Sequence, residues 1–193
     1  MSFAHEKLQF LKKPDKSLAG GIDRAIKKLV DKINSKEYNY TTSSCAGRIL
    51  LMPEKRKKQE KVFCCVYHDP ISFDKLMDDI KGLKNIKGAI YINDIIYLKH
   101  EPCIMHVACK DLKHAKNLIN KARHAGWKKS GIISIKPDKV MCELVSTEIL
   151  AAPIADKGNI IIDNNYLKIL VKECNNKLSQ TRLKIKKLEK EIK

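Results

Sequence analysis

The sequence predicts an α+β fold, in which a mixed β-sheet packs against helices and a long helix ends the chain. Of the 193 residues, 44% are hydrophobic, which is enough to build the core of one domain of ordinary size. Short apolar runs typical of strands outnumber amphipathic helices and do not alternate regularly with them, as they would in a βαβ architecture. The segment 164–193 repeats apolar side chains every three or four positions, which is typical of one helix face.

The first part of the chain is expected to form one helix followed by strands. Apolar residues at helical spacing predict an amphipathic helix over 20–35. Strands are expected near 38–42 and 48–52. A further buried strand is expected over 62–67, and His68-Asp69-Pro70 ends it.

The middle of the chain contains a short helix and a hairpin. Ser72 is placed to cap a helix that runs to about Lys81. The segment 89–99 is rich in Ile and Tyr and is expected to turn near Asn93-Asp94.

The next elements are strand, helix and two strands. A strand over 103–109 leads to Asp111, which is expected to cap a helix that Gly126 stops. Two more strands are expected over 130–135 and 140–146.

The tail is expected to be a separate part of the molecule. We predict a globular domain over 1–163 and a basic amphipathic helix over 164–193. The apolar stripe of this helix is narrow enough for a coiled-coil seam or for docking on the sheet. Lysines cover the opposite face, so that the helix could also serve as a basic arm for RNA. The stripe consists of Leu167, Leu170, Cys174, Leu178, Thr181, Ile185, Leu188 and Ile192.

The chain is strongly basic, with a formal charge of +17 from 39 Lys and Arg against 22 Asp and Glu. This excess favours a polyanionic partner, because each neutralised phosphate releases counterions. A lysine-rich proteome would yield the same composition without such a partner. A membrane surface fits less well, since no bulky apolar face accompanies the charge. One basic cluster is expected to contact RNA: Lys55, Arg56, Lys57, Lys58 and Lys61.

Composition also bears on the cellular compartment. No run is long enough to span a membrane, and the first residues lack the apolar core of a signal peptide. The seven cysteines are odd in number and show no framework spacing. We therefore predict reduced thiols in a cytoplasmic protein.

Several kinds of site are disfavoured. Gly20-Gly21 precedes a helix but follows no strand, which argues against a dinucleotide-binding or P-loop fold. The residues His100, Cys103, His106 and Cys109 recur every third position, yet a strand would point the histidines and the cysteines to opposite faces. No metal site is therefore expected. A thiol nucleophile, Cys45 with His68 or His106, is a further alternative, although lone cysteines are more often small buried hydrophobic residues.

Two segments carry more polar groups than packing needs. A strand that breaks between Ser43 and Gly47 would expose hydroxyls, turned backbone N–H groups and the Arg48 guanidinium at one point, which suits an anionic ligand. An ordinary hairpin turn explains the same composition. The strand that follows Pro102 places His106 on one face beside the carboxylate of Glu101, which makes it a candidate base or a packed core histidine.

Four segments form a distinctive set, and three shorter ones extend it. They are Asp15-Lys16-Ser17 with Gly21-Ile22-Asp23, Tyr40 to Ile49, His68-Asp69-Pro70 and Glu101 to Cys109, extended by Ser130-Gly131-Ile132, Ser146-Thr147-Glu148 and Pro153. Taken together, these segments resemble the wybutosine-synthesising tRNA methyltransferases of archaea and eukaryotes, the third enzyme of that pathway. The match covers roughly 1–155. The chain departs from the family pattern at Ala46, where serine is common, and at Cys103, where an aromatic residue is frequent.

The resemblance implies an enzyme that transfers a methyl group from S-adenosylmethionine to a tRNA. The acceptor would be N4 of 7-aminocarboxypropyl-demethylwyosine, a tricyclic base at position 37 of phenylalanine-accepting tRNA. A base in the anticodon loop is already partly splayed, so that presenting it costs little. The family lacks the glycine-rich signature of Rossmann methyltransferases, which agrees with its absence here.

The matching segments also imply site residues. Transfer from a sulfonium needs alignment above all, but the ring nitrogen must lose a proton, for which His106, His68 and Glu101 are the candidate bases in that order. Arg48 would clamp either the methionine carboxylate of the cofactor or the acidic side chain of the acceptor base. The residues expected to bind the cofactor are Ser43, Ser44, Gly47, Arg48, Ser130 and Gly131.

Two other classes of function fit the same sequence. A non-catalytic RNA-binding protein would need the basic surface but no cofactor. A cysteine-dependent enzyme or a metalloprotein would need an activated thiol or an ion. The sequence does not decide the oligomeric state.

Overall fold

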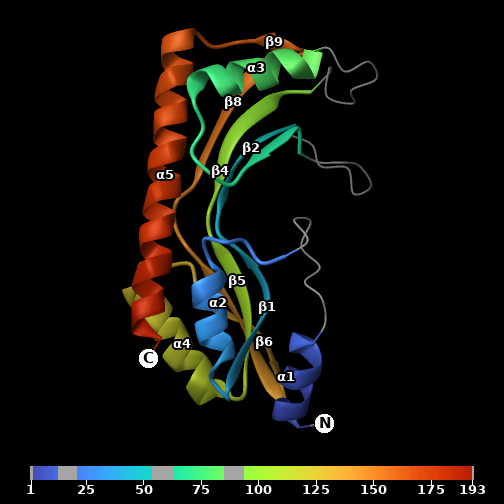
Figure 1. Ribbon diagram of the computed structural model, residues 1–193, viewed down its shortest axis with the longest axis vertical. Helices are drawn as coiled ribbons and strands as arrows, with labels where there is room; N and C mark the ends of the chain where they lie inside the picture. The colour runs from blue at the N-terminus through green and yellow to red at the C-terminus, as the bar shows by residue number, and fades with distance from the viewer. Residues whose placement is uncertain (1, 13–20, 54–62, 85–93, 193) are drawn as a thin grey trace. The chain divides into compact units, whose positions relative to one another are not determined.

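The computed structural model describes residues 2–12, 21–53, 63–84 and 94–192 (Figure 1). Within them the helices are α1 (Phe3–Leu11), α2 (Lys27–Asn34), α3 (Phe73–Lys84), α4 (Leu112–His124) and α5 (Asn164–Glu191). The strands are β1 (Asn39–Cys45), β2 (Arg48–Pro53), β3 (Cys65–Tyr67), β4 (Ile96–Glu101), β5 (Ile104–Cys109), β6 (Gly131–Lys136), β7 (Lys139–Val145), β8 (Leu150–Asp156) and β9 (Asn159–Ile160). The α+β class is confirmed.

The strands form two sheets rather than the single mixed sheet that we expected. One sheet has the strand order β1-β5-β7-β6 and the other β3-β2-β4-β8-β9. All of the described pairs are antiparallel. None of the described helices combines the length and the apolar character needed to cross a membrane.

Each sheet belongs to one of two compact units. Unit 1 comprises Met1–Ala46, Pro102–Thr147 and Thr181–Lys193, and unit 2 comprises Gly47–Glu101 and Glu148–Gln180. The chain therefore passes between the units several times. Helix α5 contributes residues to both units.

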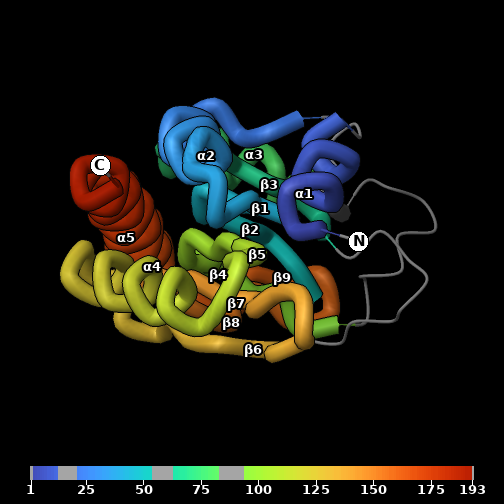
Figure 2. The backbone as a smooth tube through the Cα atoms, turned by 90° about the horizontal axis from the view of Figure 1, so that it is seen from below, coloured from blue at the N-terminus to red at the C-terminus, as the bar shows by residue number. Residues whose placement is uncertain are grey.

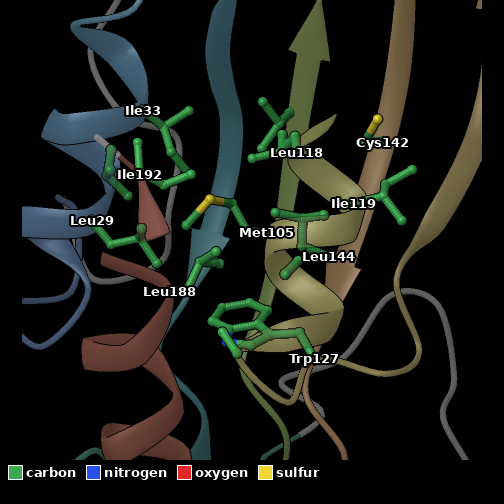
Figure 3. Packing of buried hydrophobic residues seen from close by; sticks show 14 of the residues in the cluster. Leu29, Ile33, Met105, Leu118, Ile119, Trp127, Cys142, Leu144, Leu188 and Ile192 are labelled. Atoms are coloured by element: carbon green, nitrogen blue, oxygen red, sulfur yellow. The ribbon is translucent and has the colours of Figure 1, made fainter. Parts of the chain in front are cut away.

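One face of the unit 1 sheet carries the main core of that unit. Residues from α2, α4 and the end of α5 pack there against β5 and β7 (Figure 3). Trp127 is fully buried in this core, and its Nε1–H donates to the carbonyl oxygen of Lys184 at 3.1 Å. The residues labelled in the figure are Leu29, Ile33, Met105, Leu118, Ile119, Trp127, Cys142, Leu144, Leu188 and Ile192.

The other face of the same sheet is only partly covered. Helix α1 lies on this side, whereas α4 lies on the other (Figure 2). The rings of Phe3 and Phe10 each lie 5.4 Å from the ring of Tyr40, which also packs with Ala108 and Met141. The cluster covers one end of this face and leaves the neighbouring part of it accessible.

Local signals explain how the unit 1 helices begin and end. Asp111 caps α4 as expected, because its side chain accepts the backbone N–H of His114 at 2.9 Å. Gly126 follows the helix with φ +95°, a conformation that glycine adopts without strain. Helix α2 begins later than the expected residue 20, since Asp23 Oδ1 accepts the N–H of Ala25 and forms a turn there.

Unit 2 is held by α3 and the first part of α5. The side chain of Asn175 on α5 bonds the backbone of Ile71 in both directions, at 3.0 and 2.8 Å. On β3, the hydroxyl of Tyr67 donates to Asp79 Oδ2 of α3 at 2.6 Å. The core of this unit lies between these helices and strands β2, β4 and β8.

Several boundaries differ from the expected ones. In the described residues β3 is shorter than the expected strand over 62–67, and α3 runs beyond Lys81 to Lys84. Most of the expected hairpin over 89–99 lies outside the described residues, while β4 pairs with β2 and β8. Helix α1 and strands β8 and β9 were not expected from the sequence.

Candidate functional site

A row of three polar side chains crosses the open face of the unit 1 sheet. Ser43 on β1 pairs with His106 on β5, and His106 pairs with Glu143 on β7. Residues that face each other on antiparallel strands point to the same side of a sheet. All three side chains therefore lie on the face that α1 covers only in part.

A β-bulge brings the serine into this row. The register of β1 shifts between Thr41 and Ser43, so that Thr42 is an extra residue. Without it, strict alternation from Tyr40 would place Thr42 opposite His106. Thr42 Oγ1 instead donates to the carbonyl oxygen of His106 at 3.4 Å.

The three side chains are joined by hydrogen bonds. Ser43 Oγ lies 2.7 Å from His106 Nδ1, and His106 Nε2 lies 3.0 Å from Glu143 Oε1. A carboxylate can only accept, so it selects the ring form with the proton on Nε2. In the neutral ring Nδ1 is then the basic nitrogen, and the serine hydroxyl donates to it.

The row is accessible to a ligand and has apolar borders. Ser43 is exposed, and the side chains of His106 and Glu143 are 31% and 36% exposed. On the strand beyond Glu143, the facing residue is Gly131, and a Cβ added there would meet nothing within 4 Å. The flanking rows on this face consist of Tyr40, Ala108 and Met141 on one side and Cys45, Ile104 and Val145 on the other.

Unit 2 holds a separate polar group at Arg48. Its Nε and Nη2 both donate to Glu101 Oε2, at 3.1 and 3.0 Å, from neighbouring positions on β2 and β4. The guanidinium carbon also lies 4.6 Å from the ring centroid of Phe63. A guanidinium has five N–H donors in a fork, so that this group can recognise a further carboxylate.

The expected bases belong to different units. His106 belongs to unit 1, whereas Glu101 and His68 belong to unit 2. The carboxylate beside His106 is Glu143, and Glu101 pairs with Arg48. His100, which we expected on the face of His106, is buried in unit 2, where its Nδ1 bonds the backbone oxygen of Glu148 at 2.8 Å.

Glu143 was not among the candidates, although the sequence contains a signal for it. It is the only acidic residue in the expected strand over 140–146, and it stands between Cys142 and Leu144. Both neighbours are buried, so alternation sends the carboxylate to the opposite face. The sequence does not indicate that this strand pairs with the strand that carries His106.

The other expected binding residues have different environments. Ser130 is buried; its hydroxyl donates to Trp127 O at 2.6 Å and accepts the N–H of Val145, which stabilises the turn after α4. Ser44 pairs with Met105 on the helix-covered face. Gly47 is buried with φ +80°, where other residues would be strained. The basic cluster Lys55, Arg56, Lys57, Lys58 and Lys61 lies outside the described residues.

None of the seven cysteines forms a disulfide bond. Burial raises the pKa of Cys64 and of Cys174 to about 12, which keeps both thiols protonated at neutral pH. In the described part of the chain, no three or more His, Cys, Asp or Glu side chains gather in a way that could hold a metal ion.

Comparison with known proteins identifies the family. A family model described as Methyltransferase TYW3 matches residues 4–193. The chain belongs to this family. TYW3 membership confirms the resemblance found in the sequence, makes the protein a methyltransferase and implies a methyl donor.

Named relatives of the TYW3 family match almost the whole chain. A Methanocaldococcus jannaschii protein, tRNA(Phe) 7-((3-amino-3-carboxypropyl)-4-demethylwyosine(37)-N(4))-methyltransferase, is 34% identical over 186 residues, 94% of this chain and 92% of that protein. The mouse tRNA wybutosine-synthesizing protein 3 homolog is 34% identical over 95% of this chain and 70% of the mouse protein.

Solved structures have the same fold. The PH1069 protein from Pyrococcus horikoshii superimposes with a TM-score of 0.82 at 30% identity, covering 97% of this chain and 90% of that one. A hypothetical protein from Aeropyrum pernix superimposes with a TM-score of 0.74 at 26% identity, covering 88% and 96%.

Proposed function

We propose that this TYW3 methyltransferase acts on tRNA(Phe), where it methylates N4 of the 7-(3-amino-3-carboxypropyl)-4-demethylwyosine at position 37. The observation that carries the proposal is the similarity to the M. jannaschii enzyme of that name, which extends over 94% of this chain. The polar row of Ser43, His106 and Glu143 supplies a suitable base. Seven cysteines without a disulfide bond are consistent with the cytoplasm as the compartment.

His106 is the residue proposed to act as the base for the proton that the acceptor nitrogen loses. A ring nitrogen that gains a methyl group must lose its N–H proton, and a base within hydrogen-bond reach assists this loss. Because Glu143 selects the Nε2–H form, His106 offers Nδ1 as a base. The apolar borders of the row suit the flat face of a base, and among the described residues a Cβ added at Gly131 would meet no atom within 4 Å.

S-adenosylmethionine is the proposed methyl donor, and when bound it would supply an electrophilic methyl group on a sulfonium. The donor chemistry of the chain fits this molecule, since its methionine end carries a carboxylate and Arg48 presents a guanidinium fork. The acceptor base carries a 3-amino-3-carboxypropyl group of the same chemistry. Arg48 is therefore proposed to hold one of these two carboxylates.

A direct assay tests the function. The substrate is tRNA from a strain that lacks this enzyme, incubated with the protein and S-adenosylmethionine that carries an isotopically labelled methyl group. We expect one labelled methyl group on the modified base at position 37, detected by mass spectrometry of the digested nucleosides. As a control, tRNA from the parent strain already carries the methyl group and should take up no label.

Calorimetry with S-adenosylmethionine distinguishes this function from non-catalytic RNA binding. Saturable binding is expected for a methyltransferase. A protein that binds the tRNA but neither binds S-adenosylmethionine nor transfers label would be an RNA-binding protein, and the proposal would be wrong.

A further inference from the structure

The hydrogen bonds of the polar row define a direction for proton transfer. We infer that Ser43 and His106 form a proton relay in which Ser43 Oγ takes the acceptor's N–H proton, His106 Nδ1 takes the serine proton, and Glu143 positions the ring. The inference rests on the proposed function, because it concerns the proton that N4 must lose. Glu143 is a positioning residue, since it acts through His106.

The hydrogen bonds of the neutral His106 ring have one direction. A neutral imidazole carries its proton on either nitrogen, and a carboxylate 3.0 Å from Nε2 favours the proton there. Nδ1 of the neutral ring is then an acceptor, and the group 2.7 Å from it is a hydroxyl, which donates to it. Every bond of the row consequently points from Ser43 through the ring to Glu143.

The protein already occupies both nitrogens of His106, one with Ser43 and the other with Glu143. Both ends of the row are accessible, because Ser43 is exposed and the Glu143 side chain is 36% exposed. The Ser43 Oγ keeps acceptor capacity while it donates to Nδ1. A substrate N–H that approaches from the β1 side would therefore meet the serine oxygen before the ring.

The relay balances in atoms and charge. The acceptor proton moves to Ser43 Oγ while the original hydroxyl proton moves to His106 Nδ1. A nitrogen–carbon bond replaces a sulfur–carbon bond, whose electron pair stays on sulfur. The positive charge lost at sulfur thus appears on the imidazole ring, where the carboxylate of Glu143 stabilises it. The ring returns its proton to water after the product leaves.

The same three residue types occur in hydrolase triads, where serine is a nucleophile. In those triads the serine bonds Nε2 of the histidine, whereas here it bonds Nδ1. The test therefore includes a fluorophosphonate probe, which labels nucleophilic serines covalently.

The positions of the protons can be measured without any substrate. In the free protein, ¹⁵N NMR of the His106 ring, recorded at a pH where the ring is neutral, should show its proton on Nε2. In Glu143→Gln the amide can donate as well as accept, so both tautomers should appear. Glu191→Gln removes an equal charge from an exposed position of α5 in unit 1 and should leave the His106 signals as they are.

Kinetics then test the role of the serine. Ser43→Ala should lower kcat about a hundredfold, as expected for loss of a proton-transfer group, with the KM for tRNA nearly unchanged. Ser43→Thr keeps a hydroxyl and should recover part of the rate. Ser35→Ala removes an exposed serine at the end of α2, on the helix-covered side of the same sheet; it is the matched control and should retain the wild-type rate.

The outcomes separate the relay from the proposed function. A wild-type protein that transfers no methyl group would overturn both. If the wild type is active but Ser43→Ala is equally fast, only the relay fails. A His106 ring with its proton on Nδ1, or a fluorophosphonate adduct on Ser43, would likewise overturn the relay.

Discussion

At the scale of single residues, Arg48 is where the structure adds most to the expectation from the sequence. The sequence placed a guanidinium next to a hydroxyl-rich turn and suggested a carboxylate ligand. In the structure a carboxylate from the same unit, Glu101, already accepts two of its N–H bonds. A ligand carboxylate would therefore share the fork with Glu101 or displace it.

Replacing Arg48 by alanine should separate ligand binding from stability. The side chains of the pair are 23% and 27% exposed, and partly exposed ion pairs contribute at most about 1 kcal/mol. We therefore expect the midpoint of urea unfolding to shift only slightly. The binding of one of the two carboxylate-bearing substrates should weaken at least about tenfold. Calorimetry with S-adenosylmethionine and the KM for tRNA identify which of the two is affected.

Glu101→Gln is the matched variant for this pair. A neutral amide competes less for the guanidinium than a carboxylate does, so S-adenosylmethionine or tRNA should bind at least as tightly as to the wild type. If both variants instead lose equal stability and bind both substrates normally, the pair is purely structural and Arg48 holds no substrate.

At the scale of elements, long periodic segments were predictable and context-dependent ones were not. Helix α4 was predicted with its cap at Asp111 and its end at Gly126, because both signals are local. Strand β8 was missed because it contains Pro153, which is typical of edges. At Pro153, β8 pairs with β4 on one side only. On its other side β9 pairs with Ala155 and Asp156 and does not reach Pro153, so no neighbouring strand there needs the N–H that proline lacks.

The candidate site was predictable only in part, for a related reason. His106 could be chosen from its strand alone, but its partners depend on which strands pair. The bulge at Thr42 reverses the alternation of β1 and brings Ser43 instead of Thr42 to His106. Glu143 belongs to β7, and no local sequence pattern indicates that β7 pairs with β5.

Helix α5 allows a sharp prediction about truncation. Its buried residues divide between the two cores: Leu167, Leu170, Val171, Cys174 and Leu178 in unit 2, and Ile185, Leu188 and Ile192 in unit 1, none more than 6% exposed. Burial of each such side chain is worth about 1.5–3 kcal/mol. Removing the last three therefore takes away a large part of the about 5–15 kcal/mol typical of a domain.

A chain that ends at residue 180 should lose the packing of unit 1. Trp127 is the only tryptophan, is fully buried there and bonds Lys184 of the removed segment, so its fluorescence should shift to the red. The control variant Lys186→Ala/Lys187→Ala/Lys190→Ala keeps the apolar residues and should keep the native emission. Native emission and cooperative unfolding of the truncated chain would mean that the end of α5 is a dispensable arm.

At the scale of the whole molecule, the charge of +17 is the feature that bears on the tRNA partner. Long-range attraction depends on the net charge, whereas each direct phosphate contact adds a term to the salt dependence of binding. The two contributions can be separated because basic residues are plentiful on faces away from the polar row. Helix α4 and the turn after it, on the helix-covered side of the unit 1 sheet, carry several exposed lysines.

Two variants of equal charge change test whether the basic cluster contacts tRNA. The first replaces Lys55, Arg56, Lys57, Lys58 and Lys61 by alanine, and the control replaces Lys110, Lys113, Lys116, Lys128 and Lys129. Each phosphate contact contributes about 0.7–0.9 to the slope of log affinity against log salt. Loss of five contacts should therefore flatten the slope for tRNA(Phe) by up to about 4 in the first variant. The control should bind somewhat more weakly with nearly the wild-type slope, since it alters the net charge alone. If both variants keep the same salt slope as the wild type, the cluster makes no direct phosphate contacts and tRNA is attracted only by the overall charge.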